Sequence, residues 1–463
     1  MTSANHPASL SRDDLLVLVA ELQRQLAALR AAIEQLTRGG KRQAAPFAKG
    51  PRVADPKPPG RKPGSGTVRY RERPRPEEIT EPPVDVRVLV DACPAWGGFL
   101  AAERVDDAYR TELPVRPRPQ VTPYRVWVCR CVLCGRPVRG QQPEVAPDQS
   151  GATAHRLGAR LRAAAHTLPY GVGIPVRKVP AVVHALTGVR LTQGALTQDA
   201  LPHAEGALGT AYEGLRASIP GAPVVHTDDT GGRVGGEPAY LMAFETETAT
   251  HSQIRTRHRH EEVQEVIPAD YAGVMVTDRG RSDDARAFDG VPQQKCLAHL
   301  QRSSSDVLAT KKGRARDFGE QLKALLQETL ALWHAYRDNQ RTDFKVDAEA
   351  LQEAISSQLH HRRLKDPDNQ RLLNELGWHH DRGHLLRFLV DPRVEPTNNR
   401  AERALRPAVI ARKVSQCSKN DRGAGAFAVF TSVIRTLMNT DTASMVAPRS
   451  HLLRPTQRHY AST

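Results

Sequence analysis

The clearest apolar pattern in the chain lies near its start, between residues 11 and 37. Seven apolar residues recur there at alternating steps of four and three: Leu15, Val19, Leu22, Leu26, Leu29, Ile33 and Leu36. This spacing forms one seam along a helix with a 3.5-residue period, which is typical of a coiled coil. Ser11 and Asp14 have capping spacing, and two glycines end the pattern. We therefore expect a coiled coil and a homodimer or higher oligomer. A single amphipathic helix that docks on its own protein is the alternative.

Residues 150–218 are rich in Ala, Leu and Arg and predict helices. Within them, an apolar stretch over 179–186, a turn at Gly188 and a Thr192 cap before 193–201 have the spacing of a helix-turn-helix. Helical hairpins of this length are also common where no DNA is bound. Both interpretations stay open.

Beyond Pro223 the pattern becomes strand-like. The expected strands cover 224–228, 235–246, 250–256 and 273–278, with a helix over 261–267. The first and last strands each run from apolar residues into an acid, Asp228 and Asp278. We expect both acids at one rim of a sheet, where a rigid support can place oxygen ligands for a hard cation. The commoner role of an Asp after a strand is to form a turn or cap a helix.

The acids next to these two are expected to play no part in the site. Asp229 follows Asp228 directly, and side chains alternate between faces along a strand, so only one of the two should reach a metal. Asp283 and Asp284 are interpreted as surface acids.

A third acid, Glu402, should lie in the first turns of a later helix. Asn399 and Glu402 also have the spacing of a capping box, in which the carboxylate would only accept a backbone hydrogen bond. The many Asn and Arg residues around Glu402 are a poor composition for a simple core helix and favour a functional role. Three carboxylates spaced widely in the chain can hold two divalent ions roughly 3.5–4 Å apart. Mg²⁺ suits such an all-oxygen site, with Mn²⁺ as an alternative.

The chain has 463 residues, which suggests two or three domains, and 39% of them are apolar. Its 66 Lys and Arg against 51 Asp and Glu give a net charge of +15, which favours a polyanionic partner, nucleic acid first. A generally basic proteome is the alternative explanation. The sequence contains neither a long apolar run nor a secretory leader, so we expect a cytoplasmic protein without a membrane partner.

Much of this charge lies in a Pro- and Gly-rich stretch at 38–85 that contains few large apolar residues. Such a segment cannot bury enough surface to fold alone. Lys57, Arg61 and Lys62 within it could follow a phosphate backbone or a minor groove. A solvated linker explains the composition equally well.

Four of the six cysteines lie close together: Cys93, Cys129, Cys131 and Cys134. The last two form a C-x-x-C-G knuckle that suits tetrahedral zinc. A zinc ribbon needs a second knuckle, and Trp96 stands where its second cysteine should be. We predict a zinc-ribbon-like module over 86–145. Bound zinc and a ribbon that has lost its metal both stay open.

With these features, the sequence resembles the insertion-sequence-66 family of bacterial transposases. The motifs that carry the resemblance are HTDDT at 226–230, VTD at 276–278, CLAHLQR at 296–302 and TNNRAERALRP at 397–407. The resemblance implies an α/β RNase H-like catalytic core with Asp228, Asp278 and Glu402 as its acid triad. It also implies a helical insertion before the glutamate, which agrees with the helical spacing of Leu322 and Leu326.

The patterns above and the resemblance together predict eight segments along the chain. They are a coiled coil (11–37), a basic linker (38–85), a zinc-ribbon-like module (86–145), a helical DNA-binding region (150–218), the first part of the core (222–302), the helical insertion (303–390), the last part of the core (391–438) and a divergent tail (439–463).

The resemblance further implies metal-dependent cleavage and strand transfer at the inverted repeats of an element, with target DNA and accessory proteins as partners, near the nucleoid. The residues expected to contact DNA in the core are Arg302, Asn398, Asn399, Arg403 and Arg406. Cys296 and His299 have ligand spacing, but we favour a packed helix start beside the site.

The sequence departs from the family pattern at Trp96, Asp229, Leu297 and the tail after about Met438. The tail leaves open whether this copy is active. A non-catalytic DNA-binding protein derived from a transposase is therefore the alternative function. A structure-specific nuclease would share the acids and lack strand joining.

Overall fold

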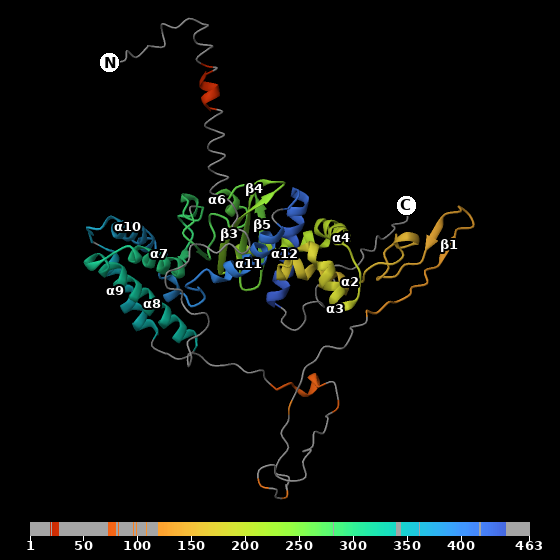
Figure 1. Cartoon of the computed structure of the whole chain (residues 1–463), viewed down its shortest axis with the longest axis horizontal. Helices are drawn as coiled ribbons and strands as arrows, with labels where there is room; N and C mark the ends of the chain where they lie inside the picture. Colours follow the sequence, from red (N-terminus) through yellow and green to blue (C-terminus); the bar gives the residue numbers. More distant parts are fainter. Residues whose placement is uncertain are drawn as a thin grey trace. The chain divides into compact units, whose positions relative to one another are not determined.

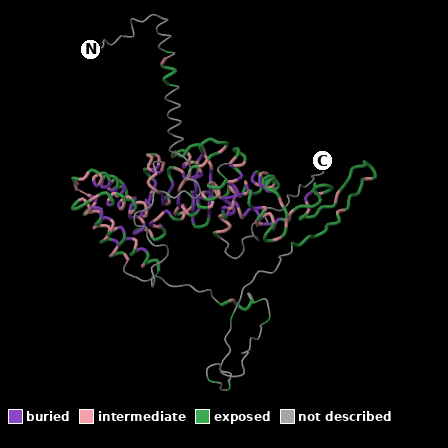
Figure 2. The backbone as a smooth tube through the Cα atoms, viewed as in Figure 1, coloured by how far each residue is buried: buried purple, intermediate pink, exposed green. Residues whose placement is uncertain are grey.

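The fold comes from a computed structural model of the chain. It describes residues 19, 21–26, 73–79, 82, 96, 99, 108 and 119–440, apart from 281, 339–343, 361 and 416–417 (Figures 1 and 2). The chain divides into two units, Met1–Glu112 and Leu113–Thr463, and the fold below belongs to the second. Most of the predicted coiled coil, Lys57, Arg61, Lys62, Cys93 and the tail from 441 lie outside the described residues. Residues 19 and 21–26 are helical, as the seam predicts.

A five-stranded mixed sheet forms the centre of the second unit, in the order β5-β4-β3-β6-β7. The strands are β3 (Val224–Val234), β4 (Glu237–Glu245), β5 (Thr250–Arg255), β6 (Val274–Thr277) and β7 (Gln293–Lys295). β3, β4 and β5 form an antiparallel meander, whereas β6 and β7 run parallel to β3. The meander and the strand before Asp278 were predicted; β7 was not.

Alternate residues of the central strands point into two different cores. Val225 and Met275 pack with residues around α6 (His260–Gln264) on one face. Their neighbours Val224 and Val276 pack on the other face. On that face pack α7 (Leu297–Ala309) and α11 (Asn399–Ser415). The core under α7 continues into α8 (Asp317–Arg337), α9 (Phe344–Leu359) and α10 (Pro367–Asp381). Apolar residues on both faces therefore hold the central strands rigidly in place.

The helices α8, α9 and α10 follow one another between α7 and α11, where a helical insertion was expected. Their apolar faces form one core with α7, in which Leu322 and Leu326 of α8 are almost fully buried. In Figure 1 these helices lie together beside the sheet.

A second group of helices precedes the sheet: α2 (Ala159–Thr167), α3 (Val179–Thr187), α4 (Gln193–Glu205) and α5 (Ala207–Ser218). The two helices expected within 179–201 and the turn between them are present. Gly188 adopts φ 73° at the turn, a conformation that glycine reaches without strain, and the Thr192 hydroxyl accepts from Ala195 N at 3.1 Å.

The last described helix, α12 (Asp421–Thr440), joins the helical group to the sheet. One of its faces packs with α4 and α5, with Phe430 buried between them. Its hydroxyls also meet the edge strand β5. Ser432 Oγ accepts from Ser252 N at 2.8 Å, and Thr436 Oγ1 accepts from Thr250 N at 2.9 Å.

The strands β1 (Val128–Arg130) and β2 (Pro137–Arg139) form a separate antiparallel hairpin. Figure 2 shows it exposed along most of its length. In the part of the chain that the structure describes, no helix has the length and apolar character needed to cross a bilayer.

Candidate active site

Asp228 and Asp278 stand level with each other on neighbouring strands. β3 and β6 pair in parallel at Val225↔Met275 and His226↔Val276, and each Asp lies two residues beyond the second pair. The two carboxylates therefore belong to the same face of the sheet. The prediction that both acids end their strands is right only for Asp278, which follows β6. β3 continues through Asp228 because its later residues pair with β4.

The sheet register places Asp229 on the opposite face from Asp228. Asp228 lies opposite Ala243, which packs against α11, whereas Asp229 lies opposite Met242 in the core around α6. Asp229 Oδ2 is 3.1 Å from His258 Nδ1. Only Asp228 of this pair therefore faces the same side as Asp278.

Glu402 lies in the first turn of α11, as predicted. The helix begins at Asn399, and Glu402 N donates to Asn398 O, so the capping-box alignment with Asn399 is displaced by one residue. Within the described residues, no backbone N–H donates to the Glu402 carboxylate. The side chain is thus left free to face the sheet.

The start of α11 is tied to β3 and α7 through Asn398. Its side-chain amide donates to Thr227 O at 2.8 Å, and its backbone N–H donates to Cys296 Sγ at 3.2 Å. Asn398 is completely buried. It was predicted to contact DNA, but burial and these two bonds make it a support that holds Glu402 near Asp228.

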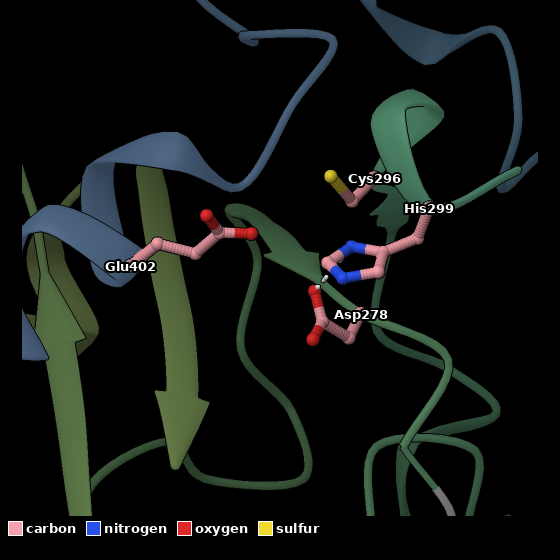
Figure 3. Close-up of side chains that lie close together, drawn as sticks. All are labelled: Asp278, Cys296, His299 and Glu402. Carbon is pink, nitrogen blue, oxygen red and sulfur yellow. Dashed lines mark ion pairs between the residues drawn. The ribbon is translucent and has the colours of Figure 1, made fainter. Parts of the chain in front are cut away.

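Asp278 and Glu402 converge with two further side chains, Cys296 and His299 (Figure 3). One ligand atom from each of the four lies within 4.8 Å of the other three. His299 Nδ1 is 3.2 Å from Asp278 Oδ1. Sequence reasoning favoured a purely packing role for Cys296 and His299, although their C-x-x-H spacing carried the signal. The structure places them in the site.

The beginning of α7 explains this convergence. Cys296 N donates to Thr277 O at 2.9 Å, and Leu297 N donates to Pro396 O at 2.9 Å. The helix start is therefore bonded both to the residue before Asp278 and to the loop that leads into α11. Cys296 is fully buried at this junction, while His299 is half-buried one turn later.

Neighbouring acids add to the effect of burial on Asp228. Burial raises the pKa of Asp228 to about 7, and the charges of Asp278, Asp229 and Glu402 raise it further. Asp278, whose Oδ1 lies 3.2 Å from His299 Nδ1, is the main cause that raises the pKa of His299 to about 10, followed by the neighbouring Cys296. Unpaired like charges in one half-buried space are what a bound cation relieves.

Behind the site lies a buried charge network that was not foreseen. Lys295 of β7 is fully buried, and its Nζ is 2.7 Å from Asp284 Oδ1 and 2.9 Å from Thr277 Oγ1. Asp283 is also buried, and burial raises its pKa to about 7. The interpretation of Asp283 and Asp284 as surface acids was therefore wrong, because the chain folds them inward over Lys295.

The donor set fits a hard divalent cation. Ligand atoms of Asp278 and Glu402 lie within 4.8 Å of each other in a group that does not include Asp228. Asp228 stands level with Asp278 on the neighbouring strand, and the charges of the other two acids contribute to its raised pKa. Buried Asp278 Oδ1 has no partner in hydrogen-bond geometry among the described residues. Carboxylate oxygens that lack donors are suitable ligands for Mg²⁺ or Mn²⁺.

Comparison with known protein families identifies the family of the chain. The family described as "Transposase IS66 family" matches residues 155–426, more than half of the chain. The chain belongs to the IS66 transposase family. No curated protein matches it.

The match runs from the helical group to α12 and so includes both aspartates, Glu402 and the α8–α10 helices. Membership of the IS66 family gives the chain a transposase role, and a transposase acts on DNA.

The three arginines of the core that were predicted to contact DNA lie on the surface beside the site. Arg302 is exposed on α7, three residues beyond His299, and Arg403 and Arg406 are exposed on α11. Arg406 lies one helical turn from Glu402. Asn399 is exposed at the start of the same helix. Only the buried Asn398 departs from the expectation for this group.

Of the cysteine cluster, the structure describes Cys129, Cys131 and Cys134. Cys129 lies in β1, and Cys131 and Cys134 lie in the turn that follows, where Gly135 N donates to Cys131 O at 2.9 Å. Hydrogen bonds from the Cys134 and Leu133 backbone lower the pKa of Cys131. Among described residues, the two groups able to hold a metal do not include these thiols. Trp96 is exposed.

Proposed function

We propose that this chain is a DDE-type transposase that cleaves DNA at element ends and joins the 3′-hydroxyl to target DNA. Asp228, Asp278 and Glu402 are its catalytic acids. The observation that carries the proposal is the level placement of the two aspartates on parallel strands, with a Glu402 oxygen of α11 within 4.8 Å of an Asp278 oxygen. The strand order and directions support an RNase H-like core.

The three acids would hold two Mg²⁺ ions, or Mn²⁺. When bound, such ions lower the pKa of water or of a DNA 3′-hydroxyl and stabilise the departing oxygen. The protein's own part is positioning. Asn398 holds the start of α11, and the contacts of Cys296 and Leu297 hold α7 beside the end of β6. Exposed Arg302, Arg403 and Arg406 are placed to bind phosphates on either side.

The remaining segments would bring DNA to this site. The 11–37 coiled coil would pair two subunits, and the basic linker with Lys57, Arg61 and Lys62 would follow the DNA backbone. The zinc-ribbon-like module and the helix-turn-helix of α3 and α4 would recognise the ends. The exposed positions on α4, including Gln193 and Gln198, are available for that contact. Such work at element ends would occur at the bacterial nucleoid.

A pair of adjacent substitutions tests the site. Asp228→Ala should reduce Mg²⁺-dependent cleavage of end DNA by roughly 10³-fold or more, since it removes a metal ligand. Asp229→Ala should retain cleavage because Asp229 lies on the other face and pairs with His258. Both variants should bind end DNA as the wild type does, measured by fluorescence anisotropy.

Three outcomes separate the candidate functions. Equal losses in Asp228→Ala and Asp229→Ala would contradict the assignment of the acids. A wild-type protein that binds ends and never cuts would favour the non-catalytic DNA-binding alternative. Cleavage without joined products would favour a nuclease.

A further inference from the structure

Beside its oxygen donors, the site contains a sulfur and a nitrogen that a magnesium site does not need. Cys296 Sγ and the His299 ring lie within 4.8 Å of carboxylate oxygens of Asp278 and Glu402. Figure 3 shows Glu402 of α11 on one side of a shared space, with His299 of α7, Cys296 just before α7 and Asp278 just after β6 on the other. Mg²⁺ selects oxygen ligands, so this set has a different chemical preference from that of the three acids alone.

Two buried atoms at the centre of this space lack suitable partners. His299 Nδ1 and Asp278 Oδ1 are 3.2 Å apart, yet among the described residues neither has a partner in hydrogen-bond geometry. Buried polar atoms of this kind are rare in native proteins and often mark an ion or water that binds between them. The thiol beside them accepts only a weak bond from Asn398 N, at 3.2 Å.

One thiolate, one imidazole and two carboxylates form a tetrahedral donor set of the kind that Zn²⁺ and Co²⁺ prefer. The ligand atoms of a tetrahedral zinc ion stand roughly 3.5 Å apart. The four donor atoms here lie within 4.8 Å of one another, so side-chain movements of about an ångström would bring them to that distance. Cys296 and His299 lie at i and i+3 on α7, which presents both donors from one helix face.

We propose that Asp278, Cys296, His299 and Glu402 form a binding site for a thiophilic transition metal such as Zn²⁺. Because such an ion occupies Asp278 and Glu402, it excludes the Mg²⁺ pair and inhibits DNA cleavage. The inhibition rests on the proposed function, whereas the binding rests only on the four donors. The site would make strand cleavage sensitive to free zinc.

Cobalt reports the binding without any need for activity. Full-length metal-free protein titrated with Co²⁺ should develop the ultraviolet thiolate-to-cobalt charge-transfer band and the visible bands of tetrahedral Co²⁺. A Cys129→Ser/Cys131→Ser/Cys134→Ser variant should keep a charge-transfer band, which removes the hairpin thiols as its source. Cys296→Ser in that background should abolish it, and His299→Gln should weaken the visible bands.

A charge-transfer band of equal strength with and without Cys296 would overturn the proposal, as would the absence of any such band in the hairpin variant. Cys296→Ser is nearly isosteric, and its hydroxyl can still accept from Asn398 N, so the fold should survive; circular dichroism checks this. His299→Gln is a second, independent removal of a donor.

Competition then tests the inhibition. Each variant's Mg²⁺-dependent cleavage is normalised to its own zinc-free rate and titrated with Zn²⁺. The half-inhibitory Zn²⁺ concentration should rise by at least about tenfold in Cys296→Ser. Equal inhibition of both proteins would contradict the site. Failure of the wild type to cut would count against the proposed function alone, because the cobalt spectrum still decides the binding.

Discussion

Asp199 in the helical group and Asp228 in the sheet are both partly buried, but their neighbouring side chains shift their pKa values in opposite directions. Asp199 Oδ1 is 3.0 Å from Arg162 Nη1, and its Oδ2 is 2.8 Å from His166 Nε2. Asp228 instead faces Asp278 and Glu402. Burial alone would raise the pKa of both carboxyls.

The outcomes are opposite. For Asp199, burial is outweighed by the hydrogen bond from His166 and the charges of Arg162, His166 and His203, and the pKa falls to about 2. For Asp228, burial and the neighbouring acids act together, and the pKa rises to about 7. Asp199 thus stabilises the junction of α2 and α4. The charge of Asp228 destabilises the metal-free fold. A destabilising buried charge of this kind is expected at a functional site.

The largest expected effect on stability comes from removing Asp199 from its contacts with Arg162 and His166. Asp199→Ala should lower the free energy of unfolding by about 3 kcal/mol, because it removes the carboxylate that pairs with both Arg162 and buried His166. Urea denaturation followed by circular dichroism measures the change. Glu205→Ala is the matched control. It removes the exposed Glu205–Arg422 pair between α4 and α12 and should change stability little. Equal effects of the two substitutions would refute the contrast.

Substitution of Asp228 should change the free energy of unfolding in the opposite direction. Asp228→Asn should raise the free energy of unfolding of the metal-free protein by about 2 kcal/mol at pH 8, while abolishing cleavage. Asn keeps the hydrogen bond that Asp228 Oδ1 accepts from Asp229 N at 2.8 Å. Denaturation in the presence of a chelator measures the gain. A loss of stability at pH 8 would show that the buried charge of Asp228 does not destabilise the metal-free fold.

The contributions of Asp199 and Asp228 to stability should depend on pH in different ways. The folded pKa of Asp228 is raised, so its cost is absent below the ordinary value of 3.8, grows as pH rises and is complete above about 7. The folded pKa of Asp199 is lowered, so its contribution is complete above 3.8 and is lost as pH falls through about 2. Relative to Asp199→Asn, the wild type should therefore lose about 1 kcal/mol between pH 4 and pH 2. Denaturation curves at several pH values check this; a flat difference would refute the assignment.

Much of the fold could be predicted from local patterns. The Thr192 cap, the Gly188 turn and the strands before Asp228 and Asp278 each depend on neighbours in the sequence. The extent of β3 beyond Asp228 could not be predicted, because pairing with β4 overrides the polar Asp-Asp-Thr-Gly-Gly sequence. β7 was missed because its Gln-Gln-Lys sequence has no strand pattern and is buried by tertiary contacts alone.

The sequence was sufficient to propose the three acids, but not to predict the buried residues around them. Asp228, Asp278 and Glu402 carry motifs, so spacing and resemblance were sufficient to propose them. Lys295 and Asp283 carry none. Their burial depends on His384 O, which accepts from Lys295 N at 2.7 Å, and on other residues far along the chain. Sequence could likewise not show that Asn398 points inward to Thr227 rather than outward to DNA.

The hydroxyls of Ser432 and Thr436 have a consequence for the fate of damaged copies of the gene. β5 is the outer strand of the sheet, and its outward N–H groups at Thr250 and Ser252 are occupied by α12. A stop codon ahead of Asp421 would leave these groups open for pairing with another chain, and would uncover the apolar surface around Phe430. Truncated copies should therefore aggregate and be degraded, rather than persist as folded proteins that compete for element ends.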